Sequence, residues 1–286
     1  MMDDVPDDLM TNPRADRVRA VHALTTLSAR RRTGTFLVEG PQGVREAVAP
    51  GGPPVHDVYA TPEAARRYDD VLAAARARGA RVRLGDEDVL AAMSPDAQGL
   101  VAVAALVPTG LGEVLAAGPT LVAVLAHVRD PGNAGTVLRA ADAAGADAVL
   151  LTRSSVDVHN PKAVRSTAGS LFHVPVVTGL EAGPAVQALR AAGLTVLAAD
   201  GAGDLDLDDL LDVAGHAPAG TPDLARPTAW LFGNEAWGLR AEDRALADAV
   251  VRVPIRGRAE SLNLATAAAV CLFASARAHR PRTGPA

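Results

Sequence analysis

Short apolar runs and amphipathic segments alternate along this chain, and the alternation predicts an α/β protein. Runs of a few apolar residues are separated by stretches in which apolar side chains recur at helical spacing. Up to residue 106, strands are expected at 35–38, 55–60, 81–84 and 99–104, and helices at 14–32, 44–48, 63–78 and 86–93. These segments predict a compact α/β domain.

The pattern lapses between residues 107 and 120, where Gly and Pro surround one short apolar turn. These residues interrupt helices and strands alike, so a domain boundary is expected there. The first 13 residues are acidic and precede any periodic segment, which is typical of disorder. The predicted organisation is a disordered tail at 1–13, a small α/β domain at 14–106, a linker at 107–120 and a second α/β domain at 121–280.

The second domain repeats the alternation. Strands are expected at 121–126, 148–151, 173–177, 195–199, 229–232 and 250–255, and helices at 134–144, 161–170, 185–192 and 262–278. Two of these strands end in polar loops. The run 229–232 stops at Gly233 and Glu235 follows, and the strand 250–255 leads to Ser261, which can cap the last helix. Open α/β sheets place ligands at such strand ends, so a ligand site is predicted here.

A third loop precedes the helix expected at 134–144. Asp130-Pro131-Gly132 has turn chemistry, and Asn133 can cap that helix. Arg139 falls outside the apolar stripe of the same helix, one turn beyond its start. It is therefore a candidate for pointing at a ligand from near the loop.

Arginines surround the apolar stripe of the expected helix 14–32, and Arg30 and Arg31 are among them. Two interpretations stay open, an RNA-facing patch or the solvated face of an ordinary helix. The net charge of the 286 residues is −5, so no global basic field indicates a nucleic-acid partner. Local patches matter more than the total, so an RNA partner is weakened and not excluded.

The single cysteine, Cys271, lies in the apolar C-terminal helix, either as a buried structural thiol or as a nucleophile. One cysteine forms no disulfide within the chain, which agrees with a reducing cytosol. There is no signal-peptide pattern and no apolar run of the roughly 18 residues that a membrane span needs. We therefore expect a cytoplasmic protein with no membrane association.

Several common site signatures do not occur. The sequence has no GxGxxG after the first strand of either domain, no GxxxxGK[ST], no CxxC and no HExxH, and its seven histidines show no ligand spacing. No metal is expected.

The predicted helix 262–278 is apolar over much of its circumference, which indicates packing on two sides and favours a partner subunit.

Three dispersed motifs of the second domain resemble the SpoU (TrmH) family of S-adenosylmethionine-dependent RNA 2′-O-ribose methyltransferases, which belongs to the SPOUT superfamily. The resemblance covers about residues 120 to 278 and implies a deep trefoil knot around a parallel sheet. The motifs are Asn-x-Gly-x-x-x-Arg, Leu-Phe-Gly-x-Glu-x-x-Gly and Val-Pro followed by Glu-Ser-Leu-Asn, here Asn133, Gly135, Arg139, Leu231, Phe232, Gly233, Glu235, Gly238, Val253, Pro254, Glu260, Ser261, Leu262 and Asn263.

The amino-terminal domain is similar to the ribosomal-protein-like, RNA-substrate-binding domain of thiostrepton-resistance-type rRNA methyltransferases. This second resemblance depends on Phe36-Leu37-Val38-Glu39-Gly40 and on the segment 98–103, QGLVAV. It implies an RNA substrate, with rRNA favoured over tRNA. The family resemblance also implies a homodimer.

The resemblance implies a site with three groups of residues. The catalytic group is Arg139, Asn133, Ser261, Asn263 and Glu235. The group for S-adenosyl-L-methionine, bound mostly through main-chain atoms, is Leu231, Phe232, Gly233, Val253, Ile255, Leu262 and Leu264. The RNA-binding group is Arg165, with Arg30 and Arg31 added from the basic helix.

The expected chemistry is methyl transfer to a ribose 2′-hydroxyl. A guanidinium with a pKa above about 12 is a poor proton acceptor, so we expect Arg139 to fix the hydroxyl and the adjacent phosphate and to stabilise the developing alkoxide. Which group accepts the proton stays open. Three alternatives also stay open: a tRNA substrate, methylation of a base nitrogen, and a non-catalytic RNA-binding or ribosome-assembly protein.

Overall fold

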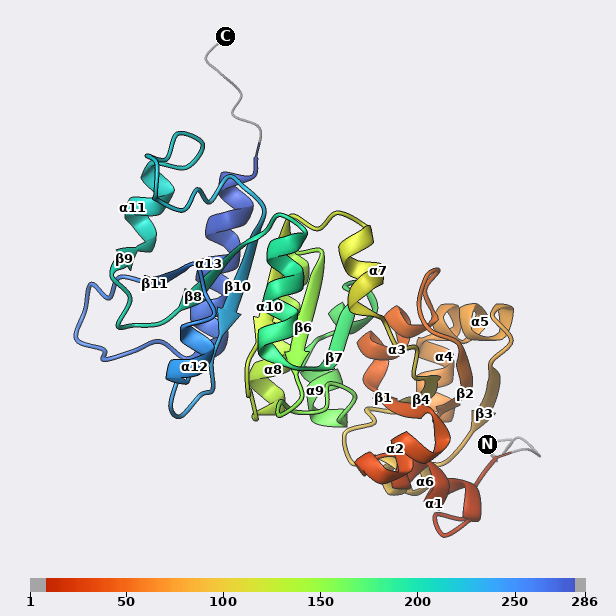
Figure 1. Cartoon of the computed structure of the whole chain (residues 1–286). Helices are drawn as coiled ribbons and strands as arrows, with labels where there is room; N and C mark the ends of the chain where they lie inside the picture. The colour runs from red at the N-terminus through yellow and green to blue at the C-terminus, as the bar shows by residue number, and fades with distance from the viewer. Residues whose placement is uncertain (1–8, 281–286) are drawn as a thin grey trace. The chain divides into compact units, whose positions relative to one another are not determined.

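A computed structural model describes residues 9–280, which form two compact units (Figure 1). The first unit contains the residues up to 107 together with 157–173. The second contains 108–156 together with the residues from 174 onward. The α/β fold class is confirmed, because both units combine a β-sheet with helices.

The first unit has a four-stranded sheet in the order β1-β4-β2-β3, in which β4 is antiparallel to β1 and β2, and β2 is parallel to β3. Its strands are β1 (Thr35–Glu39), β2 (Val55–Ala60), β3 (Arg81–Leu84) and β4 (Leu100–Ala105). Its first six helices are α1 (Asp16–Ala23), α2 (Leu27–Thr33), α3 (Gly40–Val48), α4 (Pro62–Arg67), α5 (Asp69–Ala77) and α6 (Glu87–Met93). Successive strand residues belong to different cores, as Val38 packs with α3 and α5 while Leu37 packs with α1 and α6.

The single helix expected at 14–32 is wrong, because the chain forms α1 and α2 with a break between them. Thr26 caps α2 by accepting from the backbone N–H of Ala29 at 3.3 Å. The break changes the helical phase and turns Arg30 inward, where it is 2% exposed. Its guanidinium donates to Asp157 at 2.7 Å and to the carbonyl of Leu24 at 2.7 Å. The RNA-binding role predicted for Arg30 is therefore wrong, since its donors are buried and occupied.

Residues 157–173 lie in the first unit, although the sequence pattern assigned them to the second domain. This segment forms α9 (Pro161–Ser166) and a short 3₁₀ helix, η1 (Ser170–Phe172). Val164 joins the core beneath α3, and the ring of Phe172 stacks near Phe36. Apolar spacing shows that a helix has a buried face, but it does not show which core receives that face.

The two segments predicted without regular structure are also partly ordered. Of the tail at 1–13, residues 1–8 lie outside the described part, whereas Met10 donates its backbone N–H to Leu84 at 2.9 Å. The predicted linker 107–120 holds the helix α7 (Leu111–Ala116), and Val114 is buried in the core of the second unit. Long-range pairing and burial therefore order residues 9–13 and the predicted linker.

The second unit has a seven-stranded sheet in the order β7-β6-β5-β10-β8-β11-β9, with every neighbouring pair parallel. Its strands are β5 (Leu121–Leu125), β6 (Ala148–Thr152), β7 (Val176–Leu180), β8 (Thr195–Ala199), β9 (Leu205–Asp206), β10 (Thr228–Phe232) and β11 (Ala249–Arg252). Its further helices are α8 (Pro131–Ala143), α10 (Ala182–Ala191), α11 (Leu207–Asp212), α12 (Ala241–Arg244) and α13 (Leu264–Ala278). The trefoil knot stays a prediction.

The central strand β10 is buried on both faces. Leu231 packs into a core with α7 and α10, whereas the neighbouring Trp230 donates its indole N–H to Ser275 of α13 at 2.9 Å. In Figure 1, α13 runs beside β10 in the blue part of the chain, and the two elements are in contact. Because all seven strands are parallel, the loops that follow β5, β8, β10 and β11 emerge at one edge of the sheet.

Candidate active site

Glu235 joins the loop after β10 to the loop after β5. Its carboxylate accepts hydrogen bonds from the backbone N–H of Asp130 at 3.0 Å, the backbone N–H of Arg129 at 3.3 Å and the side-chain amide of Asn133 at 3.3 Å. A carboxylate with three N–H donors is held in place. The geometry therefore gives Glu235 the role of a loop organiser.

Asn263 adds the loop after β11 to this network. Its side-chain amide donates to the side-chain oxygen of Asn133 at 3.2 Å, and its own oxygen accepts from the backbone N–H of Ala265 at 2.8 Å. Three of the predicted catalytic residues, Asn133, Glu235 and Asn263, thus form one chain of hydrogen bonds. It ties together three loops at the carboxyl edge of the sheet.

The helix caps at this edge differ from those expected. Asp130 caps α8 by accepting from the backbone N–H of Asn133 at 2.8 Å, so α8 begins at Pro131 and Asn133 lies in its first turn. Asn263 caps α13, so Ser261 does not. In each case another good capping residue lies close by and takes the cap. The side chain of Asn133 is thereby left to bridge Glu235 and Asn263. Ser261 is exposed, and its contact with a ligand stays a prediction.

Arg139 is exposed on α8, and it makes no hydrogen bond or ion pair within residues 9–280. Its five donors are therefore available to an anionic ligand. The structure thus brings three of the predicted catalytic residues together and leaves Arg139 and Ser261 apart from them.

The loop after β10 is tightly closed, which sequence reasoning did not foresee in detail. Asn234 and Gly238 exchange two backbone hydrogen bonds of 2.8 and 2.9 Å. A Cβ atom on Gly233 would overlap the backbone of Gly238 and Leu239, so only glycine fits there. The buried side chain of Asn234 donates to the carbonyl of His127 at 2.7 Å. The one sequence signal that Asn234 supports this loop was its position next to Glu235.

His127 follows β5 in a left-handed conformation with φ of 57°. Its Nε2 lies 3.0 Å from a carboxylate oxygen of Asp243 in α12, and both side chains are largely buried. This pair supports the loop that carries Arg129 and Asp130. No sequence signal indicated this pair, because the two residues are far apart in the chain and belong to no motif.

The residues expected to bind S-adenosylmethionine lie at the ends of β10 and β11. The end of β10 is buried at Leu231, Phe232 and Gly233, so only main-chain atoms of these residues could contact a ligand. The side chain of Ile255, after β11, is 38% exposed. Val253, Leu262 and Leu264 are half-buried. The backbone of residues 255–262 makes no hydrogen bond within the part of the chain that the structure describes. Free main-chain groups beside apolar side chains fit an adenine ring and its polar edge.

Two further residues bear on RNA binding. Arg165 lies in the first unit, where its guanidinium is held by Glu39 at 2.6 Å and Asp96 at 2.7 Å, so it is not free for a phosphate. Arg31 is exposed on α2, as a phosphate contact would require. The role of Arg165 was predicted from the family resemblance, and its pairing with distant carboxylates has no local sequence signal.

Trp237 lies on the rim of the site and is 46% exposed. The guanidinium carbon of Arg129 is 5.1 Å from the centroid of the Trp237 ring, a cation–π contact. An exposed indole beside a cation offers a stacking surface to a nucleobase.

Cys271 takes no part in this site. It is fully buried in α13, and burial raises the pKa of its thiol to about 12. The interpretation as a buried structural thiol is therefore confirmed, because a protonated, inaccessible thiol is no nucleophile.

None of the helices in residues 9–280 has both the length and the apolar character that spanning a membrane requires.

Comparison with known families matches both units. A model of the SpoU rRNA Methylase family matches residues 120–273, and a model described as RNA 2′-O ribose methyltransferase substrate binding matches residues 37–109. The chain is 32% identical to the 23S rRNA (guanosine(2553)-2′-O)-methyltransferase RlmP of Bacillus subtilis (strain 168) over 90% of its own length and 94% of the relative.

A second relative is matched over a shorter stretch. The chain is 39% identical to the 23S rRNA (uridine(2479)-2′-O)-methyltransferase of Streptomyces viridochromogenes over 51% of its own length. That alignment covers 49% of the relative, about half of it.

Similar structures have been solved. An AdoMet-bound rRNA methyltransferase from Sinorhizobium meliloti has a TM-score of 0.79 and 31% identity, with 94% of this chain and 97% of that chain covered. The SpoU methyltransferase AviRb from Streptomyces viridochromogenes, in complex with AdoMet, has a TM-score of 0.78 and 31% identity, with 92% and 98% covered. Sequence motifs, parallel sheet and whole-chain similarity agree, and this chain belongs to the SpoU rRNA methylase family.

Proposed function

We propose that this protein transfers a methyl group from S-adenosyl-L-methionine to a ribose 2′-hydroxyl of rRNA. The observation that carries the proposal is the hydrogen-bonded chain of Glu235, Asn133 and Asn263, which joins three loops at the carboxyl edge of the parallel sheet. Relatives named as 23S rRNA 2′-O-methyltransferases support the choice of substrate and of the methylated atom.

The loops after β10 and β11 would hold the cofactor. When bound, S-adenosylmethionine supplies a methyl group on a sulfonium. The free backbone groups of 255–262 and the end of β10 would bind its adenosine part, and the half-buried Leu262 and Leu264 would exclude water from it. The solved neighbours that contain AdoMet support this assignment.

Arg139 would bind the RNA at the reacting ribose. Its unoccupied guanidinium can hold the 2′-hydroxyl oxygen and the neighbouring phosphate together, which orients the hydroxyl for attack. It also stabilises the alkoxide that develops as the proton leaves. The Arg129–Trp237 pair would stack on a nearby base. Glu235 positions the loops.

We also propose a cytoplasmic homodimer with a trefoil-knotted second unit. Val270 and Phe273 are 40% and 50% exposed on α13, and they lie three residues apart on one helix face. Two large apolar side chains exposed side by side favour a subunit interface. Val107 and Ile255 are exposed too, but neither has such a neighbour.

The proposal is tested by transfer of labelled methyl from S-adenosylmethionine to unmodified rRNA and, separately, tRNA transcripts. Resistance of the product to ribose-directed cleavage maps any 2′-O-methyl group. Label on rRNA at a 2′-oxygen is the expected outcome. Label on tRNA alone would show that tRNA is the substrate, and label on a base nitrogen would show that the ribose 2′-oxygen is not the methylated atom. Cofactor binding without any transfer would favour a non-catalytic RNA-binding protein.

A further inference from the structure

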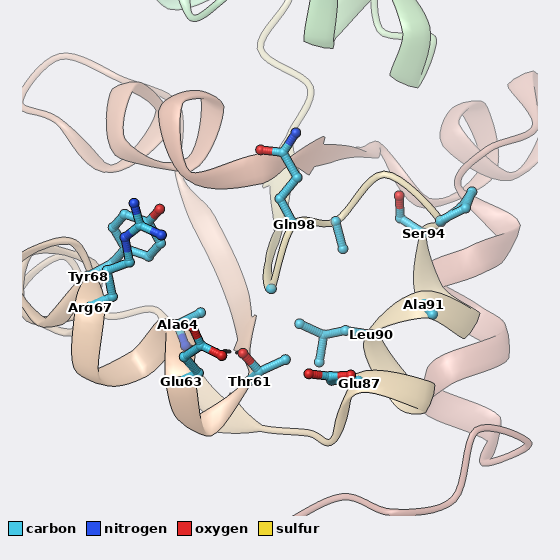
Figure 2. Close-up of a pocket in the computed structure, with 13 residues that line it drawn as sticks. Thr61, Glu63, Ala64, Arg67, Tyr68, Glu87, Leu90, Ala91, Ser94 and Gln98 are labelled. Carbon is cyan, nitrogen blue, oxygen red and sulfur yellow. Dashed lines mark hydrogen bonds between the residues drawn. The ribbon is translucent and has the colours of Figure 1, made fainter.

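The first unit contains a cavity of about 300 Å³ that the proposed reaction does not use (Figure 2). It lies between the start of α4, the helix α6 and the loop that leads into β4. The volume is at the lower end of small-ligand pockets, which run from roughly 300 to 1,000 Å³.

Small and aliphatic side chains form the inner wall of this cavity. Ala64, Leu90 and Ala97 are buried there. Gly99 has φ of +78°, and a Cβ atom on it would lie 3.0 Å from the Cβ of Ala64 and 3.1 Å from the hydroxyl of Thr61. Glycine is therefore required at this position both by conformation and by space. The result is an apolar wall without projecting side chains.

Gln98 lines the mouth of the cavity and has an unusual backbone conformation. Its φ is 48°, a left-handed conformation that side-chain-bearing residues rarely adopt. Within the described residues its amide has no hydrogen-bond partner, and in Figure 2 the amide points away from Thr61 and Ala64. Strained residues persist where the surrounding structure holds them, often at binding sites.

The rim combines a flat cationic surface with two carboxylates. The guanidinium carbon of Arg67 lies over the ring of Tyr68, 5.3 Å from its centroid, so the outer face of the guanidinium is the planar surface that remains for a ligand. Glu63 and Glu87 are exposed, and neither has an ion pair or side-chain hydrogen bond within residues 9–280. Their acceptors are available to a ligand.

We propose that this cavity binds an unpaired guanine base of the RNA substrate. Two carboxylates at the rim disfavour a phosphate inside the cavity but accept the adjacent N1–H and N2–H donors of guanine as a pair. The guanidinium of Arg67, stacked on Tyr68, supplies a planar face of the kind on which splayed bases of single-stranded RNA stack.

The inference rests on the proposed function, because it takes the guanine to be part of the RNA substrate. The cavity itself does not depend on methyl transfer. Binding and turnover are therefore measured separately, with the full chain in both cases.

The first experiment is photo-crosslinking of the full chain to 6-thioguanosine 5′-monophosphate, followed by peptide mapping. We expect attachment within 61–68 or 87–99, with GMP competing at least about tenfold better than UMP, because uracil lacks the paired donors. Glu63→Gln and Glu87→Gln should each weaken the crosslink, and Ala91→Trp, which fills the cavity from the exposed face of α6, should remove it.

The matched control is Asp88→Asn, which removes a neighbouring exposed carboxylate of α6 that does not line the cavity. It should crosslink like the unaltered protein. Attachment outside the two segments, equal competition by UMP, or an unchanged crosslink in Ala91→Trp would each overturn the proposal. Circular dichroism of each variant separates loss of the cavity from loss of the fold.

The second experiment measures methyl transfer to rRNA. If the unaltered protein is active, Ala91→Trp should raise KM for rRNA about tenfold while kcat and S-adenosylmethionine binding stay unchanged. An unchanged KM would contradict the role of the cavity in substrate binding. If the unaltered protein crosslinks as expected but transfers no methyl group, the proposed function fails and the guanine site stands.

Discussion

At the scale of single residues, the site shows how one polar side chain can connect loops that are far apart in sequence. Asn133 accepts from Asn263 and donates to Glu235, and it can do both because Asp130 has taken over the helix cap. An amide carries donor and acceptor together, which neither a carboxylate nor a guanidinium does. Arg139, by contrast, is left without a partner in the described chain, as a residue that binds ligand would be.

Replacing Arg139 by alanine should lower kcat for methyl transfer by about 100-fold or more, because it removes the group that stabilises the developing alkoxide. S-adenosylmethionine affinity and subunit association should be nearly unchanged, since the side chain holds nothing in the fold. Single-turnover transfer and calorimetry measure the two effects. The matched control is Arg153→Ala, an exposed arginine paired only with the exposed Glu181, and it should keep full activity. Near-normal turnover of Arg139→Ala would remove the assignment.

The thiol of Cys271 should resist reagents in the native protein. Burial raises its pKa to about 12, so at pH 8 it is protonated as well as inaccessible. We expect labelling by a thiol reagent to be at least about 100-fold slower in the native protein than in denaturant. Absorbance of the released chromophore measures both rates, and fast native labelling would show that α13 opens readily.

At the scale of elements, one buried ion pair fastens the segment 157–173 to α2. Burial by itself would raise the pKa of Asp157, but hydrogen bonds from His159 and Arg30 outweigh it and hold the pKa well below its usual range. The Asp157 carboxylate also accepts a hydrogen bond from the backbone N–H of His159 at 2.9 Å, which holds the turn that leads into α9. The pair therefore positions α9 as well as the guanidinium.

Asp157→Asn should destabilise the first unit by about 2 kcal/mol at pH 7, because it leaves the charge of Arg30 buried and unpaired. A lowered folded-state pKa gives stability that is complete above the unfolded pKa of about 4 and is lost as the pH falls below it. The difference between the two proteins in urea unfolding should therefore shrink between pH 5 and pH 3. Asp16→Asn, in an exposed pair with Arg19, is the control and should change little. A difference independent of pH would contradict the assignment.

At the scale of the whole molecule, the parallel order of seven strands determines where chemistry can occur. Loops that leave β5, β10 and β11 are far apart in sequence, yet they meet because the strands run in one direction and lie close together in the sheet. The exposed face of α13 is the other feature that belongs to this scale, since a second subunit would cover it.

The double variant Val270→Asp and Phe273→Asp should convert a dimer into a monomer, because charges at the centre of an apolar interface stay unpaired. Sedimentation equilibrium measures the mass. Leu27→Asp, at an exposed leucine of α2 in the first unit, is the control and should leave the dimer intact. A monomeric unaltered protein, or a dimeric double variant, would refute the proposed interface.

Local pattern and motif spacing predicted much of this protein. The strands at 55–60, 81–84 and 195–199 have the predicted bounds, because a short buried strand between turn residues leaves a clear apolar run. The motif residues Asn133, Glu235 and Asn263 were predicted to share a site, and hydrogen bonds connect them. Strand ends followed by polar loops carried that inference, since the direction of a parallel sheet brings them together.

Tertiary structure alone decided the rest. Residues 157–173 entered the first unit, Arg30 turned inward, and Arg165 paired with Glu39 and Asp96. Each of these outcomes depends on a partner more than 60 residues away, and no local pattern encodes a partner at that distance. Periodicity along the chain determines which face of an element is buried, whereas only the packed structure determines what that face is buried against.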